Sequence, residues 1–366
     1  MGSDLLQGTA DAPSSQSDPP NPPDTTDKRA NGLRVLQTDL VSRATEPRRG
    51  LVLGAGGVLG AAWTVGALCA LEDSLGVDLR TCDKILGTSA GSVLAALLGA
   101  GVSPAQMRDH QLGRVVDGPL AAMPWDYDTA TGGALPPMPR LGLGSPALFK
   151  RNARRLRRLP PTAVLSALLP VGRRSLDDLG TMVAALAPPG GWSEHPGVWI
   201  VTMDYETGRR VPFGRPGEPP ASLVEAVTAS CAIPSWYAPV TIGGHRYVDG
   251  GACSATSVDL FTGLGLDEVY VVAPMVSREL DHPRSLLGRM ERRWRAAVTR
   301  RCLHETLKLR AEGTRVTILG PGVEDLEAIG VNVMQVSRRI TVLETSLRTS
   351  AAALAAGPHL GEADAG

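Results

Sequence analysis

The stretch KILGTSAGSVLAAL, residues 84–97, decides the fold class of this chain. An apolar run leads into the pentapeptide GTSAG (87–91), and a helical pattern of apolar residues follows. This order predicts a buried strand, a sharp turn and a buried helix. A serine between two glycines at such a turn, here Ser89, is typical of an exposed nucleophile, although Ser89 could instead act as a helix N-cap.

A similar strand–loop–helix unit comes first, in GLVLGAGGVLGAAWTVGALCALEDSLGV (50–77). Two such units in succession predict an α/β fold with a parallel sheet and helices packed on it. The loop GAGGVLG (54–60) places backbone N–H groups at a helix N-terminus, where an anion is stabilised. It could be a dinucleotide fingerprint or an oxyanion hole. We favour the oxyanion hole, because the third glycine comes one residue late and Asp83 starts the next strand rather than ending it.

A serine nucleophile needs a base, and the usual one is histidine. None of the six histidines stands in an Asp/Gly-rich loop that would orient its ring. A carboxylate does: Asp249, in YVDGG (247–251), ends a predicted strand and precedes two glycines. Asp-Gly is also a common turn pair. A buried aspartate within hydrogen-bond reach of a serine can nevertheless act as its base.

Four blocks in order make the sequence resemble the patatin-like phospholipases. They are GAGGVLG (54–60), GTSAG (87–91), ASCAIPSWYAPV (229–240) and YVDGG (247–251). The resemblance implies a three-layer α/β/α core with a mostly parallel central sheet. It implies hydrolysis of fatty-acyl esters by a Ser–Asp dyad, without metal or cofactor. In this chain Ser89 would be the nucleophile, Asp249 the base, and the backbone N–H groups of Gly56, Gly57 and Val58 the oxyanion hole.

Two positions depart from the family pattern, which usually has a third consecutive glycine and a basic residue before the last glycine. This chain has Ala55 and Leu59 there. An alanine keeps the backbone donors if φ is negative. The missing basic residue removes a charge that could support the oxyanion. A catalytically weak or inactive lipid- or partner-binding protein is therefore the alternative function, and a nucleotide-binding enzyme is a second.

The remaining chain divides by composition. Residues 1–48 are rich in Pro and Ser and predict a disordered tail. We expect the acyl hydrolase domain over 49–350, with an insertion or cap at about 103–196, and a flexible tail over 351–366. A formal net charge of +0 argues against nucleic acid as a partner. Five cysteines without a CxxC spacing, and a start without a signal peptide, indicate a cytoplasmic protein.

Membrane contact is predicted from local basic segments. We expect no apolar stretch to be long enough to span a bilayer, and the longest, Val93–Val102, predicts a buried helix. Two segments mix basic and apolar residues, FKRNARRLRRL (149–159) and a helix at about 283–312, and such helices can lie on an anionic lipid surface. The alternative is a solvated or partner-binding face. The basic residues are Lys150, Arg151, Arg154, Arg155, Arg157 and Arg158, then Arg289, Arg292, Arg293, Arg295, Arg300 and Arg301.

Overall fold

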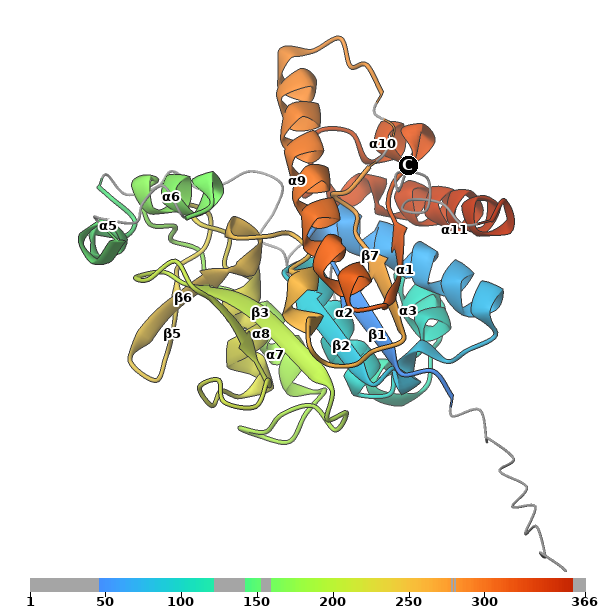
Figure 1. Cartoon of the computed structure of the whole chain (residues 1–366), viewed down its shortest axis with the longest axis horizontal. Coiled ribbons are helices and arrows are strands. Elements are labelled where there is room, and N and C mark those ends of the chain that lie inside the picture. Colours follow the sequence, from blue (N-terminus) through green and yellow to red (C-terminus); the bar gives the residue numbers. More distant parts are fainter. Residues whose placement is uncertain (1–45, 122–141, 153–158, 278, 280, 358–366) are drawn as a thin grey trace, which may run out of the picture. The chain divides into compact units, whose positions relative to one another are not determined.

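The computed structural model describes residues 46–121, 142–152, 159–277, 279 and 281–357, and the predicted tail over 1–48 therefore lies almost wholly outside it. Within this part of the chain, eight strands form one sheet with helices on both faces (Figure 1). The strands are β1 (Arg49–Leu53), β2 (Lys84–Thr88), β3 (Val198–Asp204), β4 (Arg210–Phe213), β5 (Val240–Ile242), β6 (His245–Asp249), β7 (Glu268–Val272) and β8 (Arg315–Leu319).

The sheet is mixed, with its parallel strands at the centre. Hydrogen-bonded pairing follows the path β5-β6-β3-β2-β1-β7-β8, and β4 also pairs with β3. Neighbours from β3 to β8 in this order are parallel, whereas β4, β5 and β6 pair antiparallel. Two hairpins supply the antiparallel strands, one pairing β3 with β4 and the other β5 with β6. The expected α/β architecture is confirmed.

The helices fill the two outer layers. Their bounds are α1 (Gly57–Leu75), α2 (Ala90–Gly99), α3 (Pro104–Gln111), α5 (Pro146–Asn152), α6 (Pro161–Leu168), α7 (Asp177–Ala184), α8 (Leu223–Cys231), α9 (Leu286–Ala311), α10 (Val323–Ile329) and α11 (Arg339–Ala355). The last helix, α11, begins at Arg339. It also includes 351–355 of the expected C-terminal tail, and 358–366 lie outside the described residues.

The alternation of side chains along the strands produces two cores. In β1, Leu51 and Leu53 point to one face, where they pack with α1, α2, α3, α7, α8 and α11. Val52 points to the other face and packs with Cys302 and Leu309 of α9. Figure 1 shows α9 crossing the sheet on this face. The β1 strand is therefore covered on both sides, as parallel central strands require.

Helix α1 corrects one expectation about membranes. It is long and apolar enough to cross a bilayer by composition alone, yet 67% of its most apolar window is buried inside the protein. Its partners explain why: α1 packs against α11, where Ser346 donates a hydrogen bond to the Trp63 carbonyl oxygen. We therefore interpret α1 as a core helix.

Candidate active site

Ser89 stands at a strained turn between β2 and α2. Its φ is +54°, a left-handed conformation that a serine rarely adopts. The turn needs glycine at 91, because a Cβ there would lie 2.1 Å from the carbonyl oxygen of Leu53. The backbone N–H of Ser89 donates to Ser230 Oγ (2.9 Å), and that hydroxyl donates to the Val201 carbonyl oxygen (2.7 Å). The turn is thus held against both β1 and β3.

Strand register brings Asp249 to the same place. The pairings place β2 and β6 on one edge of β3 and β4 on the other. Along that shared edge, Thr88 at the end of β2 pairs with Val201, and Asp249 at the end of β6 pairs with Thr202. The two strands approach from opposite directions and end at adjacent residues of β3. The residue after Thr88, which is Ser89, therefore lies next to Asp249.

Burial shapes the chemistry of the Asp249 carboxyl group. Only 5% of this residue is exposed. Burial raises its pKa from the ordinary 3.8 to about 6, although hydrogen bonds from the Ser89 side chain and the Gly251 backbone lower it. The Gly251 N–H donates to Asp249 Oδ1 at 2.7 Å. This carboxylate is a stronger base than an exposed one and still ionises near neutral pH.

The glycine loop has three backbone donors without a partner among the described residues. Ala55 N–H donates to the Ala255 carbonyl oxygen (2.8 Å), and Leu59 N–H donates to that of Val333 (2.9 Å). Between them, the N–H groups of Gly56, Gly57 and Val58 donate to no atom of the described residues. Gly57 and Val58 begin α1, where N–H groups lack intrahelical partners. The loop thus presents donors that an anion could accept.

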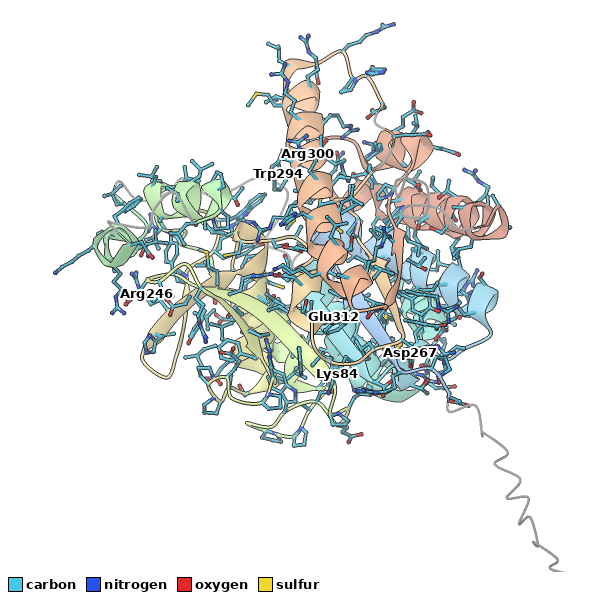
Figure 2. All side chains as sticks on the ribbon, viewed as in Figure 1. Lys84, Arg246, Asp267, Trp294, Arg300 and Glu312 are labelled. Atoms are coloured by element: carbon cyan, nitrogen blue, oxygen red, sulfur yellow. The ribbon has the colours of Figure 1, made fainter. Side chains whose placement is uncertain are left out.

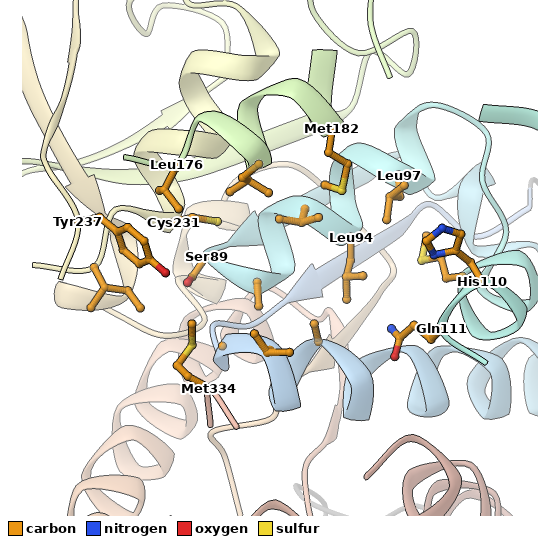
Figure 3. Close-up of a pocket in the computed structure, with 18 of the residues that line it drawn as sticks. Ser89, Leu94, Leu97, His110, Gln111, Leu176, Met182, Cys231, Tyr237 and Met334 are labelled. Carbon is orange, nitrogen blue, oxygen red and sulfur yellow. The ribbon is translucent and has the colours of Figure 1, made fainter. Parts of the chain in front are cut away.

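One cavity is lined by both the nucleophile turn and the glycine loop. Ser89, Gly57 and Val58 all line it, together with apolar side chains from α1, α2, α3 and α7. Figure 3 shows the Ser89 hydroxyl at one end, beside Tyr237 and Cys231, and His110 and Gln111 at the other. Burial raises the pKa of Cys231 to about 12, so this thiol stays protonated at neutral pH. The cavity is apolar except near its two ends, which suits a hydrocarbon chain.

Among the described histidines, only His110 lines this cavity. His110 is at the opposite end of the cavity (Figure 3), and His195 accepts a hydrogen bond from Gly197 N–H on Nδ1. His245 is half exposed beside Asp204. In the part of the chain that the structure describes, no group of three His, Cys, Asp or Glu side chains could hold a metal ion.

The sequence matches a known protein family. The sequence profile of the family "Patatin-like phospholipase" matches residues 51–262, a range that contains the glycine loop, Ser89 and Asp249. The chain belongs to this family. Membership assigns this patatin-like chain to a family of lipid acyl hydrolases. A comparison with curated proteins found no match.

Two solved structures are similar to this patatin-like chain. VipD from Legionella pneumophila has 12% identity and a TM-score of 0.41, over 85% of this chain and 67% of VipD. The type III effector protein ExoU has 17% identity and a TM-score of 0.31, over 85% of this chain and 53% of ExoU. The chain thus spans about half the length of ExoU.

Sequence reasoning missed several residues of the patatin-like site. Ser230 holds the Ser89 backbone, a role that the block 229–240 does not by itself predict. Cavity walls from α3 and α7 were expected only as part of an insertion or cap. One signal was available: positions 89, 93, 94 and 97 share one face of α2, and all four line the cavity.

The basic helix α9 requires a correction. Arg292 and Arg295 are buried rather than exposed to a membrane. Arg292 pairs with Asp281 and Glu291, and Arg295 pairs with Glu291 and donates to the Pro274 carbonyl oxygen. These two arginines fix α9 to the loop after β7. Of the first basic segment, Arg154, Arg155, Arg157 and Arg158 lie outside the described residues.

Proposed function

We propose that this chain is a serine acyl hydrolase that cleaves fatty-acyl esters of phospholipids or related lipids, with Ser89 as nucleophile and Asp249 as base. One observation carries the proposal: a buried carboxyl of raised pKa meets the serine of a strained turn. That serine lines a cavity with Gly57 and Val58, whose N–H groups are free among the described residues.

The first half of the reaction forms an acyl-enzyme. Asp249 takes the proton from Ser89 Oγ while the oxygen bonds to the acyl carbon. The ester carbonyl oxygen becomes negative and is stabilised by the N–H groups of Gly57 and Val58, with Gly56 beside them. The bond to the alcohol then breaks, and the leaving oxygen takes the proton from Asp249. The N-terminus of α1 adds its positive dipole end to this stabilisation.

The second half releases the fatty acid. Asp249 accepts a proton from water, and the hydroxide formed attacks the acyl carbon. The same N–H groups hold the second oxyanion. When this intermediate collapses, Ser89 Oγ leaves and recovers its proton from Asp249. Since both steps use one carboxyl as base and then as acid, a pKa of about 6 suits the cycle better than the ordinary 3.8.

Leu59 bears on the rate of this reaction. It stands where the family usually has a basic residue, and here it is fully buried in the apolar core. The N–H of Leu59 donates to the Val333 carbonyl oxygen, so the loop is held by packing and a backbone hydrogen bond. The loop keeps its donors, but the side chain at position 59 supplies no charge. The alternative is an inactive lipid-binding protein, and the following experiment distinguishes it from an active hydrolase.

The test is active-site labelling together with ester hydrolysis. The wild type should react with a fluorophosphonate probe and hydrolyse acyl esters. Ser89→Ala should do neither, and Asp249→Asn should lose at least a hundredfold in kcat because the base is gone. Ser74→Ala, which changes an exposed serine of α1, is the matched control. Full activity in Ser89→Ala or Asp249→Asn, or no labelling of the wild type, would refute the dyad.

We also propose that the first turns of α9 bind an anionic lipid surface. Their exposed apolar side chains are Leu286 (71%), Leu287 (72%), Met290 (66%) and Trp294 (48%). Arg284, Arg289, Arg293 and Arg300 are exposed among them, without an ion pair to any described residue. Figure 2 labels Trp294 and Arg300 on this helix. Exposed cations around an apolar strip are complementary to anionic headgroups over hydrocarbon.

The position of α9 supports this orientation. Arg295 lies level with Pro274, just past the carboxyl end of β7. Nine residues separate Leu286 from Arg295, so the helix extends about 14 Å beyond that level. Its first turns therefore project past the edge of the sheet where Ser89 lies (Figure 1). A lipid surface that bound these turns would face the catalytic edge.

Vesicle sedimentation tests this surface. Arg289→Gln with Arg293→Gln should bind anionic vesicles about 30-fold more weakly, because each cation contributes about 1 kcal/mol near such a surface. Lys84→Gln with Arg315→Gln is the control of equal charge, at the amino ends of β2 and β8. Equal binding of the wild type to anionic and neutral vesicles, or equal losses in the two double variants, would contradict the proposal.

A further inference from the structure

One face of α2 forms the floor of the cavity from the serine inwards. Ser89, Val93, Leu94 and Leu97 all line it. In a helix, positions four and eight residues apart lie along one side, and Leu94 joins them because it stands next to Val93 and three residues before Leu97. Figure 3 shows Leu94 between Ser89 and Leu97, so the cavity follows the helix axis instead of opening sideways.

The walls along this path are apolar. Helix α1 contributes Val58 and Ala61, and α7 contributes Leu179 and Met182. Met334 lies close to the Ser89 end (Figure 3). Since these side chains offer no hydrogen bonds to a polar headgroup, the part of an ester that enters here is its hydrocarbon chain.

The far end of the cavity is lined mainly by buried side chains, with the partly exposed His110 among them. Leu97 is 7% exposed, Met107 3%, Gln111 5% and Leu120 4%. They come from α2, from α3 and from the 3-10 turn Gly118–Leu120. A chain that enters beside Ser89 therefore meets packed protein after passing Leu97.

Two estimates limit the length of chain that fits. Eight residues of helix from Ser89 to Leu97 span about 12 Å. An extended chain advances about 1.2 Å per bond, as an extended peptide does, so about ten carbons fill this length. The cavity volume is about 130 Å³. A cavity of about 150 Å³ holds one benzene, so the volume gives the smaller of the two estimates, roughly six carbons.

We propose that this cavity is an acyl-chain ruler that selects acyl groups of about six to ten carbons, with Leu97 and Met107 at its far end. The inference rests on the proposed function, because the ruler measures from the carbon that Ser89 attacks. Longer chains would have to displace buried side chains or fold back towards the entrance. Either route lowers kcat/KM, since the binding energy of the distal carbons is lost.

The test compares acyl length at constant headgroup. p-Nitrophenyl esters of 4, 6, 8, 10, 12 and 16 carbons, all in the same mixed detergent micelles, should give the highest kcat/KM between six and ten carbons. The 16-carbon ester should be at least tenfold poorer. Leu97→Ala should move the optimum towards longer chains, by about the three carbons that the substitution removes. Leu165→Ala, at a half-exposed position on α6, should leave the optimum unchanged.

Alkyl fluorophosphonates of 4, 8 and 16 carbons repeat the measurement without any variant, should Leu97→Ala fail to fold. Their labelling rates of the wild type should follow the same order. Equal rates for 8 and 16 carbons, or an optimum at 16, would overturn the ruler while leaving the dyad intact. No hydrolysis and no labelling at any length would refute the proposed function, and the ruler with it.

Discussion

Replacing Asp249 with asparagine should remove activity and stabilise the protein. Burial raises the pKa of this carboxyl from 3.8 to about 6. A difference of about two pKa units between folded and unfolded chains corresponds to roughly 3 kcal/mol of destabilisation in the ionised state. Asparagine has the same shape, keeps an oxygen for the Gly251 N–H, and carries no charge to desolvate. The gain at neutral pH should approach 3 kcal/mol, or a Tm roughly 5 °C higher.

The sign of the pH dependence distinguishes this account from a general effect on packing. The folded protein holds the Asp249 proton more tightly than the unfolded chain does. The destabilisation is therefore absent below about pH 4, grows as pH rises from about 4 to about 6, and is complete above that. Asp249→Asn should thus be more stable than wild type at pH 7.5, and the two should converge towards pH 4.

Urea denaturation at pH 4.5, 6 and 7.5, followed by circular dichroism, measures this difference. The exposed Asp73 of α1 provides the control Asp73→Asn, which should show no comparable convergence. The reasoning fails if Asp249→Asn is less stable than wild type at pH 7.5, or if its advantage is the same at every pH. Retained hydrolysis by the variant would independently exclude Asp249 as the base.

Three further predictions follow from the same geometry. Below about pH 6, kcat/KM should fall about tenfold per pH unit as Asp249 gains its proton, and a flat profile down to pH 4.5 would contradict this. Gly91→Ala should destabilise the protein by several kcal/mol, because its Cβ would meet the Leu53 carbonyl; an unchanged urea midpoint would disprove the close approach. Ser230→Ala leaves the Ser89 N–H without an acceptor, so kcat should fall roughly tenfold while KM stays similar. A tenfold rise in KM with unchanged kcat would indicate lost substrate binding instead.

Local pattern predicted the central part of the fold because its signals lie within a few residues of one another. The glycines at 87 and 91 and the apolar run after them placed β2 and α2 correctly. Helix α1, with Gly76 at φ +62° as its C-cap, lies within the strand–loop–helix unit predicted over 50–77. Helix exposure was harder to predict. Arg292 and Arg295 read as a basic face, but their acidic partners and their burial depend on how α9 packs against the loop after β7.

The sequence by itself determined the chemical components: a serine at a glycine turn, a glycine loop rich in backbone donors, and an aspartate that ends a strand. The tertiary structure decided how they meet. Asp249 comes beside Ser89 only because β6 runs antiparallel along the edge of β3 where parallel β2 ends. It also decided the raised pKa, since desolvation requires the surrounding core. The cavity exists only where α1, α2, α3 and α7 converge, and no single segment encodes its length.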